Sequence, residues 1–304
     1  MVTNARDDSK EKFVDTIFGL RNIIFSQIDL VSDCLKLIIM EKKGLLNFSG
    51  AAPEVIKVVV PMIDLVSMSG NSLLKLTEEI SLNVRDAFPI VRSLVEGVVN
   101  ICYIMSLGPE VAAKAERHAE VKAYRDLKRQ WNVAGMKVDI EYLGNLSKED
   151  IDRLEAMLPE FTTKGGREKD WTDHNLRQRL DIISRNFSSK SMIMLTGSVF
   201  NIYSHASEMT HSTYFSACYF WGLTLPGRPK LSSSKAIELN LLNHQFSLFI
   251  STSFAYMGLL ECLAQYINNM KILEKSKEHY NLIKSLPIIM DEQNNPSFYR
   301  AEFS

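Results

Sequence analysis

Apolar residues repeat at helical spacing along the whole of residues 9–43. They step by three and four positions, through Phe13, Ile17, Leu20, Ile24, Ile28, Val31, Leu35 and Ile38. This period is typical of an amphipathic helix, and at about 1.5 Å per residue the helix would be roughly 50 Å long. The stripe either packs into the core of the protein or forms a seam between two copies of the chain. Stripes at this spacing mostly serve the core.

The rest of the chain follows the same pattern, with turn residues between the helical segments. We expect further helices at 54–79 (broken near Pro61 or Gly70), 86–107, 110–132, 148–158, 174–187, 191–214 and 234–270. Strand-like alternation falls in 134–144 and is too short to found a sheet. The sequence therefore predicts an all-α bundle of long helices, with a short irregular insertion around 133–172 and an extended, docked tail from Asp291 onward.

A chain of 304 residues can bury one large core. We expect residues 1–304 to form a single all-helical domain. The stretch Lys164-Gly-Gly-Arg167 is the best linker in the chain. Residues 161–172 could therefore join two sub-halves, 1–160 and 173–290, within that domain.

Charge and cysteine content indicate a reducing compartment and no general attraction to polyanions. The formal net charge is -1 and the pI about 6.6, which leaves only a local basic groove for nucleic acid. Four cysteines stand apart in apolar helical stretches, without zinc or thioredoxin spacing. Such cysteines typically act as small buried hydrophobic side chains in cytosolic proteins. We predict a cytoplasmic protein.

Membrane insertion is not expected from the apolar runs of the chain. The most apolar run without a charge, Gln245 to Leu260, has sixteen residues, fewer than the roughly 20 needed to cross a bilayer. The first twelve residues are polar and show no secretory signal. We predict buried core helices and no membrane.

Two predicted helices carry polar side chains at helical spacing on otherwise apolar faces. Arg92, Glu96, Asn100 and Tyr103 follow one another at four, four and three residues, as do Tyr203, Ser207 and His211 at four and four. Arginine and glutamate are rarely buried without a partner. Each row must therefore face polar groups inside the fold, or a cleft.

Two explanations of these rows stay open at this point. In the first, Arg92 and Glu96 form an ion pair that also bonds Tyr203 or Ser207, and the network only fixes the packing. In the second, the rows line a site for a phosphate-containing ligand. Arginine offers a bidentate fork and His211 can exchange a proton near neutral pH.

These residues resemble an uncharacterised bacterial all-helical family of unknown function, numbered 5677. The matching pieces are Arg92-Ser-Leu-Val-Glu96, Trp171, and Tyr203 through Ser207 to His211, and the resemblance covers about residues 61–220. The family implies an all-helical fold and carries no firmly assigned activity.

A more distant similarity is to the HEPN class of helical bundles. Many of its members are dimeric ribonuclease toxins or antiphage effectors, with an arginine followed after four to six residues by a histidine. Arg167 and His174 have this spacing at its upper limit, although they follow a Gly-Gly pair. Cations in 114–129 and 164–190 could steer RNA or a nucleotide toward such a site, or simply be solvated.

The leading functional hypothesis is an HEPN-like toxin or antiphage-defence effector that cleaves RNA without metal. His211 or His174 would be the general acid/base, and Arg92 or Arg167 would stabilise the transition state. Glu96, Tyr203 and Ser207 would orient those groups. No phosphate-loop, dinucleotide, metalloprotease or serine-hydrolase motif is present, so we expect neither cofactor nor metal.

Two alternatives belong to other classes. One is a non-enzymatic interaction module that forms homo-oligomers through the N-terminal helix. The other is a sensor that binds a small anionic, nucleotide-like ligand between the two polar rows.

Overall fold

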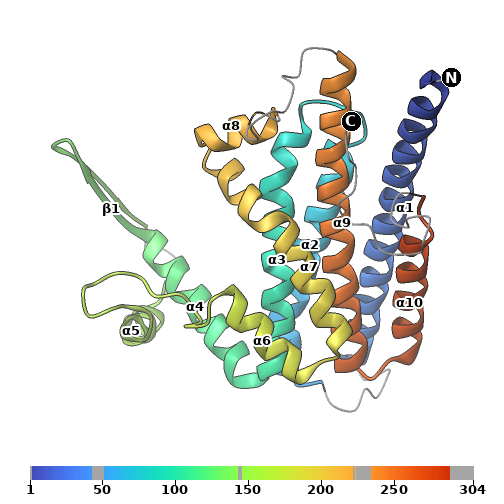
Figure 1. Ribbon diagram of the computed structural model, residues 1–304. Helices are drawn as coiled ribbons and strands as arrows, with labels where there is room; N and C mark the ends of the chain where they lie inside the picture. The colour runs from blue at the N-terminus through green and yellow to red at the C-terminus, as the bar shows by residue number, and fades with distance from the viewer. Residues whose placement is uncertain (1, 43–50, 143–145, 222, 224–233, 288–304) are drawn as a thin grey trace.

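The computed structural model describes residues 2–42, 51–142, 146–221, 223 and 234–287, and within them it is dominated by helices (Figure 1). The predicted all-α class is confirmed. The helices are α1 (Val2–Lys42), α2 (Pro53–Leu76), α3 (Val84–Leu107), α4 (Pro109–Leu127), α5 (Lys148–Met157), α6 (Leu176–Asn186), α7 (Ser189–Thr210), α8 (Tyr214–Phe220), α9 (Ser234–Tyr266) and α10 (Met270–Lys284). The predicted tail from Asp291 lies outside the described residues.

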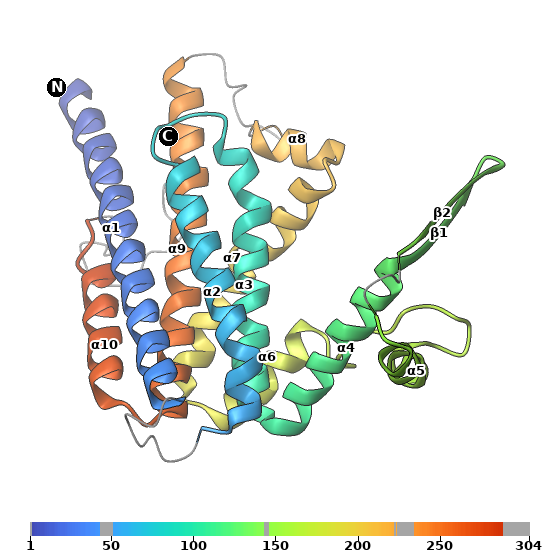
Figure 2. The ribbon, with the colours of Figure 1, turned by 180° about the vertical axis from the view of Figure 1, so that it is seen from behind.

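Helix α9 forms the centre of the bundle. It packs against α7, α3, α1 and α10, and Figures 1 and 2 show it enclosed by these neighbours. From Leu241 to Ala264 nearly every side chain is buried. A helix that is apolar all round must be surrounded, so the other long helices align beside it.

One hydrophobic core runs through the bundle and includes helices on both sides of residues 161–172. It contains buried residues of α1, α2 and α3 as well as α6, α7, α9 and α10. Cys34, Cys102 and Cys262 are buried free thiols in this core, and Cys218 is half-buried. Burial raises the pKa of Cys34 to about 12, which keeps this thiol protonated and unreactive.

Three helices are long and apolar enough to cross a membrane, judged by length and composition alone: α2, α3 and α9. The most apolar stretch of α9 is 83% buried inside the protein, against 56% for α3 and 33% for α2. The apolar surface of α9 is therefore satisfied by its neighbours. The exposed side of α2 carries Lys57, Asp64 and Lys75. That this protein has no membrane-spanning helix stays a prediction.

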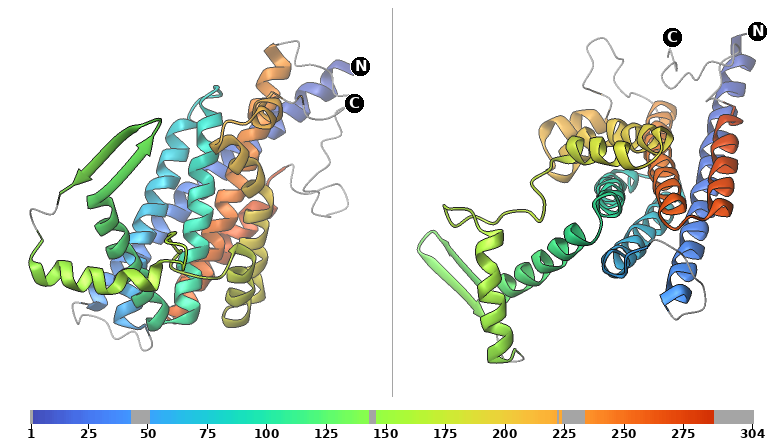
Figure 3. Two further views of the ribbon diagram at one scale, coloured as in Figure 1. Left: turned by 90° about the vertical axis from the view of Figure 1, so that its left-hand side faces the viewer. Right: turned by 90° about the horizontal axis from the view of Figure 1, so that it is seen from below.

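Residues 128–168 stand away from the bundle on the far end of α4 (Figures 1 and 3). The strands β1 (Lys128–Val133) and β2 (Met136–Glu141) form an antiparallel hairpin, and α5 is followed by the 3₁₀ helix η1 (Leu158–Phe161). The hairpin, α5 and η1 all contact α4. The predicted irregular insertion is thus largely regular.

Two sequence-based expectations about element boundaries were wrong for local reasons. The helix predicted to reach residue 132 ends at Leu127, because Ala134 and Gly135 have positive φ (54° and 82°) and close a hairpin turn. Helix α2 runs unbroken through Pro61 and Gly70. Gly70 is buried where α2 meets Tyr256 of α9 and Ile28 of α1, so its small size serves close helix contact.

Replacing Gly70 with alanine tests this contact. The added Cβ would overlap the Tyr256 hydroxyl, and we expect the free energy of unfolding to fall by about 1–3 kcal/mol. Tyr256→Phe alone removes the 2.8 Å hydrogen bond from its hydroxyl to the Val66 carbonyl, at a cost of about 1 kcal/mol. In the double variant, urea unfolding should show a loss of unfolding free energy that is smaller than the sum of the two single losses. Full additivity would contradict the contact.

Candidate functional site

The polar row of α3 is divided between two clusters, and Arg92 belongs to the first. Its Nε lies 3.2 Å from Glu96 Oε1, and its guanidinium lies over the Tyr203 ring, 4.9 Å from the centroid. Desolvation alone would lower the pKa of Arg92, but Tyr203 and Glu96 outweigh it and raise the pKa. The structure therefore brings together three residues that the sequence singled out, as a charged, half-buried contact between α3 and α7.

Ser207 and His211 lie further along α7 from this contact. His211 is the exposed residue that ends α7, eight residues after Tyr203, which corresponds to roughly 12 Å of helix. At that end Arg85 donates to the Met209 carbonyl at 3.2 Å and to Ser212 Oγ at 2.7 Å. Helices α3 and α7 are thus antiparallel, and they do not bring His211 to Arg92. A mechanism that pairs these two residues has no geometric basis.

The second cluster forms around Tyr103, one turn before the end of α3. Its side chain is buried, and its hydroxyl lies 2.7 Å from His174 Nδ1 and 3.1 Å from Thr172 Oγ1. His174 itself is half-buried. Because Nδ1 is held by a fixed partner, Nε2 is the ring nitrogen that can exchange a proton with a ligand.

Arg179 fixes the segment that carries His174. Its Nε donates to the His174 carbonyl at 2.8 Å and its Nη1 to Asn100 Oδ1 at 2.5 Å. Nη2 lies 3.6 Å from Asp170 Oδ2, and the guanidinium lies over the Trp171 ring, 5.5 Å from the centroid. These contacts use the donors of Arg179 and make it a positioning residue.

Sequence reasoning missed Arg179, although one signal was available. Asn175 and Gln178 form a capping box that starts α6, and this pattern is legible in the sequence. It places Arg179 in the first turn of α6, from which a long side chain can reach back over the preceding segment. The partner on α3, Asn100, could not be foreseen without the tertiary fold.

Arg167 lies on the same segment but does not meet His174. It is exposed, and its backbone closes a turn with Thr163 through Gly166, whose φ is 78°. No hydrogen bond or ion pair joins the Arg167 side chain to His174 within the described part of the chain. The arginine–histidine spacing of the sequence does not form a contact in the fold.

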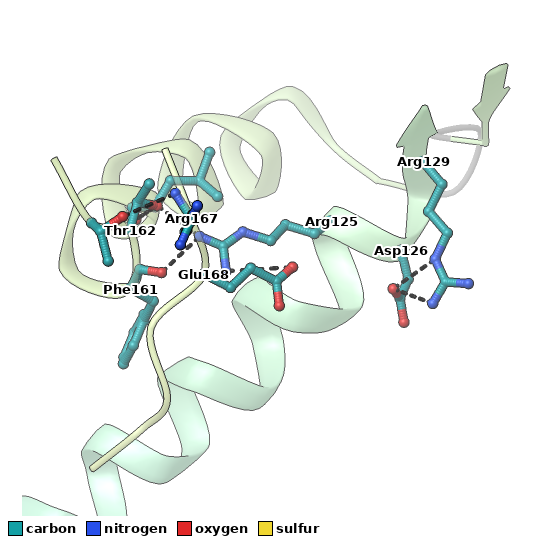
Figure 4. Close-up of polar contacts among 9 residues, drawn as sticks. Arg125, Asp126, Arg129, Phe161, Thr162, Arg167 and Glu168 are labelled. Atoms are coloured by element: carbon teal, nitrogen blue, oxygen red, sulfur yellow. Dashed lines mark hydrogen bonds and ion pairs between the residues drawn. The ribbon is translucent and has the colours of Figure 1, made fainter. Parts of the chain in front are cut away.

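Arg125 anchors this segment to α4, as Figure 4 shows. Its Nη2 donates to the Phe161 carbonyl at 2.9 Å and to Thr162 Oγ1 at 2.7 Å, and Nη1 lies 3.8 Å from Glu168 Oε1. The segment 161–175 is therefore tied at one end to α4 and at the other to α3.

The two predicted basic stretches differ in the structure. Most cations near the end of α4 are paired with acidic residues of α4, α5, η1 or the segment 161–175: Arg117 with Glu160, Arg125 with Glu168, Lys128 with Glu155 and Arg129 with Asp126. In contrast, five exposed cations of the later stretch form no ion pair with any residue that the structure describes: Lys164, Arg167, Lys169, Arg177 and Arg185. The available positive charge thus gathers on the segment that carries His174.

Within the described ranges no group of three or more His, Cys, Asp and Glu side chains could hold a metal ion. His205 instead stacks on the Tyr219 ring at a centroid distance of 4.1 Å, and His244 stacks on the Phe220 ring at 5.1 Å. Burial lowers the pKa of both histidines, so they stay neutral members of the packing at neutral pH.

These features define an all-α bundle in which one core helix carries polar side chains that hold a half-buried histidine. The chain belongs to the family of unknown function DUF5677, whose family model matches residues 72–224. That range contains α3 to α8 and with them every residue of both clusters. No curated protein and no solved structure matches the chain.

Removing the Tyr103 hydroxyl should loosen the His174 segment. We expect Tyr103→Phe to lower the free energy of unfolding by about 1–3 kcal/mol and to speed amide hydrogen exchange in residues 170–175. The matched control is Tyr203→Phe, which keeps its ring beneath Arg92 and should leave exchange in 170–175 unchanged. Unchanged exchange in the Tyr103 variant would show that the hydroxyl does not hold the segment.

Proposed function

We propose that this protein is an HEPN-like ribonuclease that works without metal, with His174 as its general acid/base. The observation that carries the proposal is the 2.7 Å contact between His174 Nδ1 and the buried Tyr103 hydroxyl. A histidine whose ring is oriented by a fixed partner, and whose other nitrogen can reach a ligand, is the arrangement that proton transfer needs.

RNA cleavage suits such a site because nucleophile and leaving group both belong to the substrate. His174 would take the proton of the ribose 2′-hydroxyl as its oxygen attacks the adjacent phosphorus. The bond from phosphorus to the 5′-oxygen breaks, and that oxygen takes a proton from solvent. The products are a 2′,3′-cyclic phosphate and a 5′-hydroxyl. This reaction requires no activated water and therefore no metal.

The exposed cations of 164–177 supply the positive charge that the pentavalent phosphate requires. Arg167 is the arginine of this set that the sequence resemblance to HEPN proteins favours, and in the structure its side chain is exposed and does not contact His174. Arg179 is already engaged by Asn100, the His174 carbonyl and Trp171. In this proposal Glu96, Tyr203 and Ser207 no longer serve the reaction. Arg92, paired with Glu96 on the same helix, instead joins α3 to α7 through the Tyr203 ring.

The cellular role belongs to the same proposal. A ribonuclease that attacks RNA broadly is harmful to the cell that makes it, which is the chemistry of a toxin or an antiphage-defence effector. Such a protein would act in the cytoplasm, where its RNA substrate is found.

Incubation of the purified full chain with total RNA in the presence of EDTA tests the activity. We expect cleavage by the wild type and at least a 100-fold lower rate for His174→Gln, since general acid/base catalysis contributes about 10²–10⁴-fold. His211→Gln should retain the wild-type rate. Equal rates for wild type and His174→Gln, or cleavage abolished by EDTA, would refute the proposal. Nucleotide binding without cleavage would support the sensor alternative.

A second function, homo-oligomerisation through α1, is favoured by an exposed apolar edge on that helix. Val14, Phe18 and Phe25 are 38%, 63% and 58% exposed. They stand four and seven residues apart and so share one side of α1, while the stripe predicted from the sequence faces the core through Leu20, Ile24 and Val31. Two exposed phenylalanines on the same side of a 41-residue helix are typical of a contact between subunits.

The oligomeric state of charged variants tests this edge. We expect Phe18→Glu combined with Phe25→Glu to convert a dimer into a monomer in size-exclusion chromatography with light scattering. Phe200→Glu is the control, because Phe200 is 81% exposed on α7, away from α1, and its replacement should leave the dimer intact. A monomeric wild type, or a dimer in the double variant, would refute the seam.

A further inference from the structure

Trp171 is a residue that the sequence singled out and that the proposed reaction does not use. With residues of α2, α3 and α4 it lines an open surface pocket of about 370 Å³. The pocket walls are mainly apolar and include Val58, Met62, Ile104, Ala115 and Ala119. Its volume lies at the lower end of the range for small-molecule sites, so a single flat ring system fits it better than a large ligand.

We propose that this pocket binds one unpaired nucleobase of single-stranded RNA, stacked on Trp171. This inference rests on the proposed ribonuclease function and names the part of the substrate that the chain would hold. Three features of the structure carry it: the fixed indole, a polar pair at the pocket, and the position of His174 beside it.

The indole of Trp171 is held rigidly. The Arg179 guanidinium covers its ring at 5.5 Å from the centroid, and the Tyr103 ring meets it edge-on at a centroid distance of 5.7 Å. Its backbone N–H donates to Asp170 Oδ1 at 2.8 Å. A preformed aromatic surface loses little entropy when a base stacks on it. Such stacking changes affinity by about 5- to 100-fold per base.

Lys57 and Glu116 are charged residues at a pocket whose accessible lining is almost wholly apolar. The two residues form an ion pair between α2 and α4, and both line the pocket. Together they present ammonium donors and carboxylate acceptors next to an apolar cavity. Nucleobases combine flat faces with donors and acceptors at their edges, so this pairing of surfaces matches a base better than a purely hydrocarbon ligand.

Trp171, which lines the pocket, and His174, in the proposed reaction centre, both contact one tyrosine. The Tyr103 ring is 5.7 Å from the Trp171 ring and 5.8 Å from the His174 ring, measured between centroids. A base in the pocket would place its attached ribose and phosphate near His174. The exposed cations Lys164, Lys169 and Arg177 lie on the chain just before and after these residues, and their charge complements a phosphate backbone.

Binding to oligonucleotides that cannot be cleaved distinguishes a contact with the base from a contact with the phosphate. The full chain is titrated into fluorescein-labelled 2′-O-methyl RNA of mixed sequence, or into the same strand with abasic sites and equal charge, and anisotropy is recorded. We expect the wild type to bind the intact strand at least tenfold more tightly than the abasic strand. Trp171→Leu should remove this difference by weakening only the intact strand. Trp221→Leu, at the residue that follows α8, should preserve it.

Several outcomes would overturn the inference. Equal affinity of the wild type for intact and abasic strands excludes a base contact, and this arm does not require that any variant fold. Absence of binding to either strand has the same consequence. A base preference that survives in Trp171→Leu places the contact elsewhere.

The two proposals can fail separately. His174→Gln should keep the wild-type preference for the intact over the abasic 2′-O-methyl strand while losing cleavage. Trp171→Leu should raise the KM for cleavable RNA at least tenfold with little change in kcat. Cleavage that depends on His174 but shows no base preference would leave the ribonuclease proposal intact and remove the pocket from it.

Discussion

The burial of α9 from Leu241 to Ala264 is the constraint on which the rest of the bundle depends. A helix with apolar side chains on all sides is stable in this fold only where other helices cover it, and α1, α3, α7 and α10 do so. Each of these neighbours packs one face against α9. The position of α3 follows from this, since it lies between α9, α2, α7 and α6 and keeps only a narrow edge for polar side chains.

That edge explains why the polar residues of α3 form two clusters rather than one pocket. Buried polar groups require partners, and α3 finds them on different elements along its length. Near its middle, Arg92 meets Tyr203 of α7, whereas Asn100 and Tyr103 meet Arg179 and His174. The second set does more than satisfy hydrogen bonds. It fixes an irregular segment that carries a histidine, a tryptophan and several exposed cations, which is why the proposed site lies there.

The sequence was sufficient where structure depends on local spacing and insufficient where it depends on distant contacts. The helical period of 9–43 and the row from Arg92 to Tyr103 were legible, because both are properties of a single helix. The hairpin at 128–141 was not, since its first strand is largely polar and its turn relies on Ala134 and Gly135 adopting positive φ. The residues that contact the polar row of α3 also could not be predicted from the sequence. The antiparallel arrangement of α3 and α7, which separates His211 from Arg92, is set by tertiary packing.

A crystal structure of the full chain with an uncleavable 2′-O-methyl dinucleotide would test the central claim most directly. We expect the bridging phosphate to lie within hydrogen-bond distance of His174 Nε2, while the Tyr103 hydroxyl keeps its contact with Nδ1. A dinucleotide bound with its phosphate away from His174, or an imidazole turned away from Tyr103, would contradict it.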